Sequence, residues 1–129
     1  MQDFTVTITP RMYETDAMGH ISNVTITAWF EILRVRYLES VMASNPGTEK
    51  RWILASTNID FVGETFYGED VIAKMVDMTI GNTSITFKAS MSQGGRQTMQ
   101  GRAVLVHMDY STRKPTRVPD DVRQAFAAR

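Results

Sequence analysis

A short segment near the start of the chain gathers side chains that could do chemistry. Residues 16–23 include an aspartate, a glycine, a histidine and an asparagine, namely Asp16, Gly19, His20 and Asn23. A helical pattern follows directly, and the first turn of a helix offers unpaired backbone N–H groups at the positive end of the helix dipole. We therefore expect the Asp16 carboxylate to lie beside donors that can hold an oxyanion. From there it can attack a carbonyl carbon or deprotonate water, which suits hydrolysis of an activated carbonyl compound.

A helix is predicted to position this segment, from residue 23 to about residue 42, because no Gly or Pro interrupts that stretch. Ser22 or Asn23 can cap its start. On a helical projection, one apolar arc holds Ile26, Phe30, Leu33, Tyr37 and Val41, and a second arc holds Val24, Ala28, Val35 and Met42. A narrow stripe between the arcs holds Thr27, Glu31 and Arg34. A helix that is apolar over most of its surface should be largely wrapped by protein.

The rest of the chain has the patterns of strands. Alternation of Phe4, Val6 and Ile8 with threonines predicts one strand before the helix. Four more strands are predicted over residues 52–62, 71–80, 84–92 and 98–109, with a turn at 43–47 and hairpin turns at 81–83 and 94–95. A short helix is expected from Pro119. This order predicts an α+β fold in which an antiparallel sheet curls about the helix. The second apolar arc then needs another partner, and a second subunit is the simplest one.

Composition narrows the class of protein. With 129 residues, 43% of them hydrophobic, we expect a single domain over residues 1–129 with a sizeable core. The 14 basic and 14 acidic residues balance, which argues against nucleic acid as a partner. There is no cysteine, so disulfides, thiolate metal ligands and a thiol nucleophile are excluded. The start of the chain has neither the basic residues nor the apolar run of a signal peptide, and no apolar run is long enough for a membrane span. A cytoplasmic protein is the expectation.

The residues then point to a family. Residues 13–23, followed by Trp29-Phe30-Glu31 and Arg34, resemble the hotdog-fold acyl-CoA thioesterases, in particular the 4-hydroxybenzoyl-CoA thioesterase branch. The order of elements agrees over nearly the whole chain, and Asp109, Lys114-Pro115 and Pro119 are similar to the ending of that branch. The resemblance implies a hotdog fold, with a long central helix wrapped by a curved five-stranded antiparallel sheet and a short C-terminal helix.

The resemblance also implies a role for each matching residue. Asp16 would be the catalytic carboxylate, and the backbone N–H of Asn23, or of a neighbour in the first turn, would bind the oxyanion. Gly19 would let the backbone bend past the ligand, and His20 would position the loop or contact Asp16. The acyl group would meet apolar side chains, which we expect to be Met18, Ile21, Phe61 and Val62.

The implied substrate is an acyl-CoA or acyl-carrier-protein thioester, and coenzyme A enters only as part of that substrate. No metal or other cofactor is expected, because Asp16, His20 and His107 have no recognised metal spacing. In related dimers the sites lie between subunits, so a homodimer or homotetramer is expected. Two departures concern the pocket: Ser22 stands where the family often has asparagine, and Ile26 where it often has tyrosine.

Several alternatives stay open at this point. Asp16 could merely complete a turn, and His20 could merely hydrogen-bond backbone. Glu31 is the rival acid if it is partly buried, but it could simply pair with Arg34 at i+3. We expect His107 to be a core or interface histidine. The basic cluster of Arg113, Lys114 and Arg117 could meet phosphates, but a solvated loop is the preferred interpretation.

Two other functions fit the same fold. A dehydratase or hydratase would need His20 or His107 to act with Glu31. A non-catalytic acyl-CoA-binding protein would need neither a catalytic histidine nor a catalytic acid. The Asp-x-x-Gly-His element directly before the helix favours the thioesterase.

Overall fold

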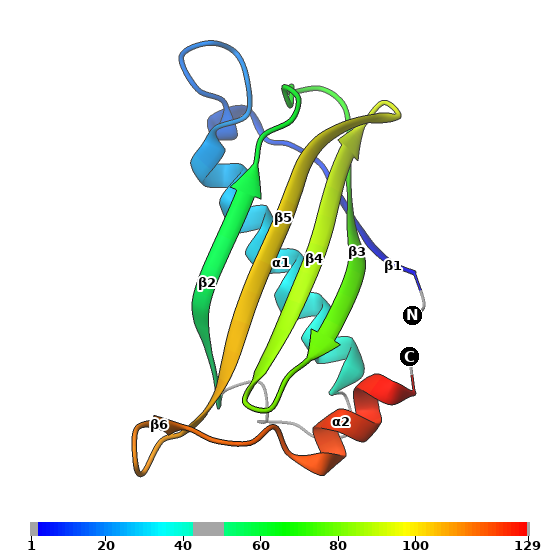
Figure 1. Ribbon diagram of the computed structural model, residues 1–129. Helices are drawn as coiled ribbons and strands as arrows, with labels where there is room; N and C mark the ends of the chain where they lie inside the picture. Colours follow the sequence, from blue (N-terminus) through cyan, green and yellow to red (C-terminus); the bar gives the residue numbers. More distant parts are fainter. Residues whose placement is uncertain (1–2, 43–50, 129) are drawn as a thin grey trace.

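A computed structural model describes residues 3–42 and 51–128 of the chain. The turn expected at residues 43–47 lies outside the described residues. In chain order the elements are β1 (Phe4–Ile8), a 3-10 turn η1 (Met12–Glu14), α1 (Asn23–Val41), β2 (Trp52–Asp60), β3 (Val71–Ile80), β4 (Ser84–Gln93), β5 (Arg96–Asp109), β6 (Lys114–Pro115) and α2 (Asp120–Ala127) (Figure 1).

The strands form one antiparallel sheet. Its order is β1-β3-β4-β5-β2, and the two-residue β6 pairs with the far end of β5. The β3–β4 and β4–β5 connections are hairpins, and Gly94 and Gly95 make the second of these turns with φ of +58° and +76°. β2 is an edge strand, and most of its residues are exposed. The sheet therefore has an open edge at β2. No other described residue of the chain pairs with the outer side of this strand.

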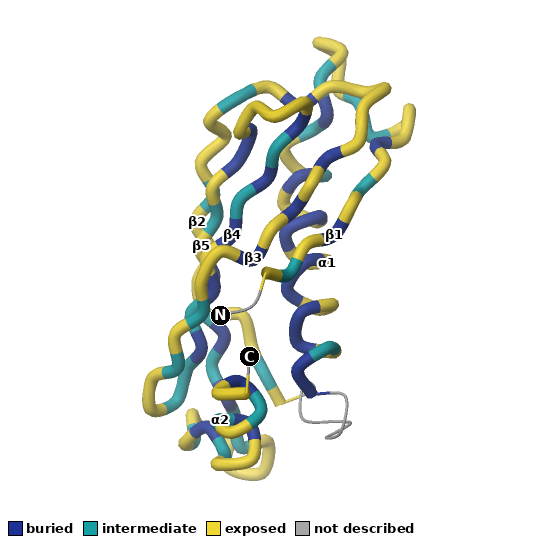
Figure 2. Tube along the Cα trace, turned by 90° about the vertical axis from the view of Figure 1, so that its right-hand side faces the viewer, coloured by how far each residue is buried: buried dark blue, intermediate teal, exposed yellow. Residues whose placement is uncertain are grey.

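The 19-residue helix α1 lies across one face of this sheet (Figures 1 and 2). Side chains alternate across a strand, so every second residue of β4 points toward the helix. These inward residues are Ile85, Phe87, Ala89, Met91 and Gln93, and all of them are buried. The core between helix and sheet confirms the predicted fold class.

The first apolar arc of α1 packs against the sheet as predicted, since all its members are buried: Ile26, Phe30, Leu33, Tyr37 and Val41. The second arc divides. Met42 is buried in the core, whereas Val24, Ala28 and Val35 face outward. Trp29 and Leu38, which neither arc included, are buried as well. The buried face of the helix is thus wider than the first arc alone. The exposed apolar stripe is shorter than the predicted second arc, because Met42 is not part of it.

Both helix starts follow from local sequence. Ser22 is the N-cap of α1, and its Oγ accepts a hydrogen bond from the Val24 N–H at 3.2 Å. Pro119 precedes α2 as its N-cap, and Asp120 and Asp121 occupy the first turn, where a negative charge is favourable. α2 closes one end of the core with Val122 and Phe126. Within the described part of the chain, neither helix is long and apolar enough to cross a membrane.

Candidate active site

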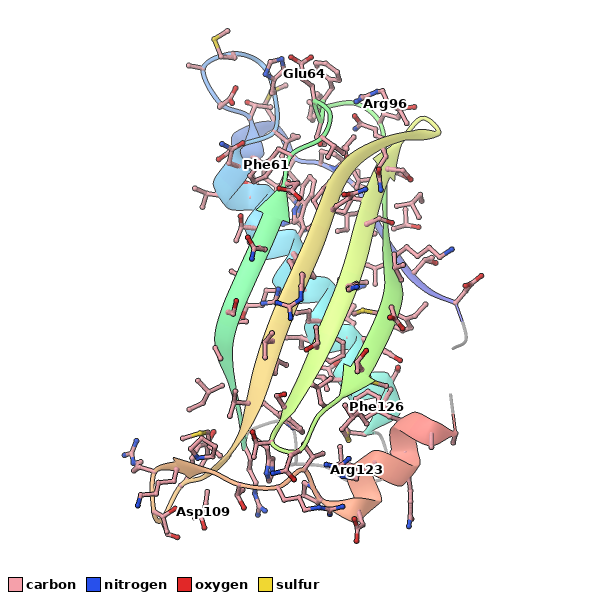
Figure 3. All side chains as sticks on the ribbon, viewed as in Figure 1. Phe61, Glu64, Arg96, Asp109, Arg123 and Phe126 are labelled. Carbon is pink, nitrogen blue, oxygen red and sulfur yellow. The ribbon has the colours of Figure 1, made fainter. Side chains whose placement is uncertain are left out.

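An open cleft of about 240 Å³ lies at the end of the sheet where α1 begins and β2 ends. The loop before α1 and the loop after β2 form it. Figure 3 shows Phe61 and Glu64 at this end of the molecule, with Arg96 from the neighbouring hairpin. The lining residues are Asp16, His20, Ile21, Asn23, Ile26, Phe61, Val62, Gly63, Glu64 and Thr65. The structure therefore brings together most of the predicted site, although Met18 and Gly19 are not among the lining residues and Met18 is 77% exposed.

The Asp16 carboxylate is held by its own loop. Its Oδ1 accepts hydrogen bonds from the N–H groups of Met18 at 2.8 Å and His20 at 3.1 Å. The Asp16 N–H in turn donates to the His20 carbonyl at 2.7 Å. Gly19 closes this turn at φ +82°, a conformation that an L side chain would strain. The turn interpretation of Asp16 is thus correct for one oxygen, while Oδ2 accepts no hydrogen bond from the described residues.

The start of α1 opens into the same cleft. Asn23 is the first residue of the helix, so its N–H precedes the first intrahelical hydrogen bond. The first turn of α1 carries no acidic residue that would neutralise the positive end of the dipole. A carboxylate and a helix N-terminus therefore line one cleft, which is the arrangement that the sequence predicts.

The loop after β2 supplies partners that the sequence analysis missed. Glu64 Oε1 lies 3.5 Å from His20 Nε2, and the Phe66 ring meets the imidazole edge-on with centroids 5.3 Å apart. The Thr65 carbonyl accepts the Ile21 N–H at 2.8 Å. His20 thus contacts Asp16 through its backbone, while its ring faces the other loop. Gly63 and Gly68, which bracket this loop directly after a strand, were the only signal in the sequence.

Gly63 lets this loop pack directly on β5. A Cβ at this position would lie 2.8 Å from the Gln97 carbonyl oxygen and 2.8 Å from an Arg96 guanidinium nitrogen. The Arg96 guanidinium is also 5.8 Å from the centre of the Phe66 ring. A positive charge therefore stands beside the loop that forms one wall of the cleft.

Glu31 and Arg34 do not behave as expected. Glu31 is exposed rather than partly buried, because it lies beside the exposed edge strand β2, where the sheet ends. No ion pair joins Glu31 and Arg34 among the described residues. Arg34 is instead buried with its guanidinium 4.4 Å from the centre of the Phe30 ring, and burial lowers its pKa. Both residues line a separate cleft between α1 and β2.

His107 and the basic cluster lie at the opposite end of the sheet. His107 is 4% exposed and packs against Trp52 with ring centroids 4.9 Å apart, which confirms a core histidine. Arg113, Lys114 and Arg117 are exposed, and Arg117 pairs with Asp120 at 2.7 Å. Over the described ranges, no group of three His, Asp or Glu side chains could hold a metal ion.

In this cleft a carboxylate and the start of a helix lie together, on a fold with this order of helix and strands. Such an arrangement fits a class of thioester-cleaving proteins. The sequence profile of the thioesterase-like superfamily matches residues 10–126, so the chain belongs to that superfamily. Its fold is the hotdog fold.

The known proteins to which the chain is similar include the following three. A predicted thioesterase from Bacillus stearothermophilus has 34% identity and a TM-score of 0.89, over 98% of this chain and 96% of the other. A thioesterase from Thermus thermophilus, solved with coenzyme A and Zn, has 21% identity and a TM-score of 0.86, over 96% and 91%. The uncharacterised protein YsmA of Bacillus subtilis (strain 168) is 22% identical over 92% of this chain and 82% of its own length.

Proposed function

We propose that this protein hydrolyses an acyl-CoA or acyl-carrier-protein thioester to a free acid and a thiol. The observation that carries the proposal is the cleft itself, which Asp16 and the first residue of α1 line together. Membership of the thioesterase-like superfamily supports the reaction class. The coenzyme A bound to the Thermus thermophilus thioesterase supports the choice of thiol.

Asp16 can act in two ways in this proposal. As a nucleophile, its free Oδ2 would attack the thioester carbon, expel the thiolate and form an anhydride that water then cleaves. As a general base, it would take a proton from water while the water oxygen attacks the same carbon. The C–S bond would then break, and the departing thiolate would take up the proton from Asp16. In both routes the oxyanion would form beside the Asn23 N–H. Loss of one such donor typically costs about 2.7–4 kcal/mol of transition-state stabilisation.

The two parts of the substrate need different surroundings. Ile21, Ile26, Phe61 and Val62 would contact the acyl group. Ile26 offers no hydroxyl, so aliphatic or unsubstituted aryl groups should react at least as well as 4-hydroxybenzoyl. The phosphates of coenzyme A need nearby cations, and Arg96 stands beside the cleft. Binding should therefore weaken as salt is added, despite the zero net charge.

A homo-oligomer is part of the proposal. β2 leaves an open sheet edge on which Ile53 and Leu54 are each 45% exposed, and the outer side of α1 exposes Val24 and Val35. Exposed sheet edges and apolar stripes are normally covered in stable proteins. Light scattering at micromolar concentration should detect at least a dimer. A single species of 14.6 kDa would contradict this expectation.

The dehydratase or hydratase alternative receives no support from the geometry. It needs a histidine beside Glu31, whereas Glu31, His20 and His107 line three different clefts.

The test is thiol release from a panel of aliphatic and aryl acyl-CoAs. We expect Asp16→Asn to lower turnover at least about 100-fold with folding intact, because positioned acid–base groups typically contribute 10²–10⁴. Glu31→Gln is the matched control and should stay within about threefold of wild type, since its carboxylate lies outside the cleft. Loss of activity in Glu31→Gln, with activity kept in Asp16→Asn, would identify Glu31 rather than Asp16 as the catalytic carboxylate. Binding of acyl-CoA without any thiol release would identify a non-catalytic binder.

A further inference from the structure

Gln93 breaks the pattern of the strand that carries it. The inward positions of β4 read Ile85, Phe87, Ala89 and Met91, and the next inward position is Gln93. The glutamine is only 2% exposed. A buried amide is unfavourable unless hydrogen bonds compensate for the water it loses. Its partners should therefore explain why the apolar series ends there.

The hydrogen bonds of the Gln93 side chain go to the backbone of one loop. Its Oε1 accepts the Phe66 N–H at 2.9 Å. Its Nε2 donates to the Phe66 carbonyl at 2.7 Å and to the Glu69 carbonyl at 2.9 Å. One buried side chain thus fixes residues 66–69 to the end of β4. The same loop continues backward through Thr65 and Glu64 into the wall of the candidate active site.

The contacts continue from this loop to the proposed catalytic carboxylate. Phe66 bridges to His20 through the backbone and packs against its ring. The Thr65 carbonyl holds the Ile21 N–H. The His20 N–H and carbonyl then hydrogen-bond to Asp16. Each step is a contact between described residues, so displacement of the loop at Phe66 would reach the segment that orients Asp16.

We propose that Gln93 is a positioning residue for the active site, which acts by clamping the loop that shapes the cleft. It touches no reacting atom. The effect on turnover rests on the proposed function, whereas the effect on the two loops does not. Because a displacement of about 1 Å can cost about 100-fold in rate, a loosened loop should lower kcat more than it raises KM.

The first test uses Gln93→Met, which keeps the length of the side chain and removes every hydrogen bond. Amide hydrogen exchange should lose about tenfold or more of its protection at Phe66, and also at Ile21 and His20, while strands β3 to β5 keep theirs. The kcat for a good acyl-CoA should fall about tenfold or more with KM within about threefold. Gln100→Leu is the matched control, since Gln100 is exposed on β5 and its side chain donates to that of Gln97 rather than to either loop. It should behave as wild type in both measurements.

A second variant, Gln93→Glu, tests the donors separately. Its carboxylate can accept the Phe66 N–H but must face two carbonyl oxygens. Burial and the two facing carbonyl oxygens disfavour the ionised form, so the pKa of this carboxyl should be raised. The protonated carboxyl has one O–H donor, so protection at Phe66, relative to wild type, should be higher at about pH 5 than at about pH 8. This variant also stands in should Gln93→Met fail to fold.

The outcomes separate cleanly. Unchanged exchange at Phe66 in Gln93→Met would show that there is no clamp. Faster exchange at Phe66 with unchanged exchange at Ile21 and His20, or with unchanged kcat, would show a purely structural glutamine and overturn the positioning role. A wild-type protein that releases no thiol would refute the proposed function, and exchange at Ile21 and His20 would still decide whether Gln93 positions that segment.

Discussion

The two ends of the sheet contain similar residues that are used in different ways. At the α2 end, Arg123 donates to the carbonyls of Val118, Gly81 and Asn82, and Arg117 pairs with Asp120. At the cleft end, Arg96 makes no ion pair among the described residues, and one oxygen of Asp16 is left without a hydrogen bond from them. Arg117 and Arg123 are thus engaged within the fold, whereas Arg96 and Oδ2 of Asp16 keep polar atoms to which no described residue hydrogen-bonds.

The two histidines show the same contrast. His20 is 30% exposed at its side chain, lies beside Glu64 and belongs to the cleft. His107 is buried against Trp52, and neither ring nitrogen has a hydrogen-bond partner among the described residues. A histidine in the sequence therefore says little by itself. Its burial and its partners decide whether it can take part in chemistry.

Among substitutions that probe the two ends of the sheet, Gly63→Ala should cause the largest loss of stability and turnover. The new Cβ would lie 2.8 Å from the Gln97 carbonyl oxygen, and backbone cannot move aside as a flexible side chain can. Overpacking of this kind typically lowers the free energy of unfolding by about 1–3 kcal/mol. Denaturant unfolding should show that loss, together with reduced turnover, because the displaced loop is a wall of the cleft.

Gly81→Ala is the control from the opposite end. Its Cβ would meet the Ser84 Oγ at 3.0 Å, and that hydroxyl can rotate away. We expect a change within about 0.5 kcal/mol, as for surface substitutions in general, and unchanged turnover. If the two variants lose the same free energy of unfolding, the loop at the cleft end is no more tightly packed than an ordinary hairpin.

A smaller effect is expected from His107→Phe. The substitution removes two buried nitrogens that lack partners among the described residues and keeps a ring beside Trp52. Replacing unsatisfied polar atoms by an apolar group of similar shape is nearly neutral or stabilising, by about 1 kcal/mol at most here. Thermal unfolding and thiol release would be compared with wild type. A marked loss of turnover in a stably folded variant would place His107 in the active site and end the distinction between the two histidines.

The sequence predicted the fold better than the surroundings of the site. Local patterns located the strands, α1 and the short α2, because alternation and helical spacing report which side of an element is buried. They also located Asp16 and Asn23, which lie close together along the chain. They did not reveal Glu64, Thr65 or Gln93. Glu64 and Thr65 reach the cleft, and Gln93 reaches their loop, only when the loop after β2 folds across the end of β4. Contacts between residues so far apart along the chain produce no periodic pattern in the sequence.

The helix faces were predicted only in part for a similar reason. A projection treats all apolar residues alike, so it grouped Met42 with Val24 and Val35 although Met42 lies in the core. It also placed Glu31 between two apolar arcs and suggested that this residue is partly buried. Glu31 instead lies beside the edge strand β2, where the sheet ends and leaves this side chain exposed. How far a sheet extends around a helix is set by tertiary packing, which the spacing of residues does not encode.

We propose that the cleft between the start of α1 and the end of β2 binds the acyl-CoA. The most direct measurement is an NMR titration with a non-hydrolysable thioether analogue of an acyl-CoA, followed at assigned backbone amides. We expect the largest shifts at Ile21, Asn23, Val62 and Thr65, which line the cleft. Shifts concentrated instead at His107, Thr116 and Arg117, which line the cleft at the α2 end, would contradict it.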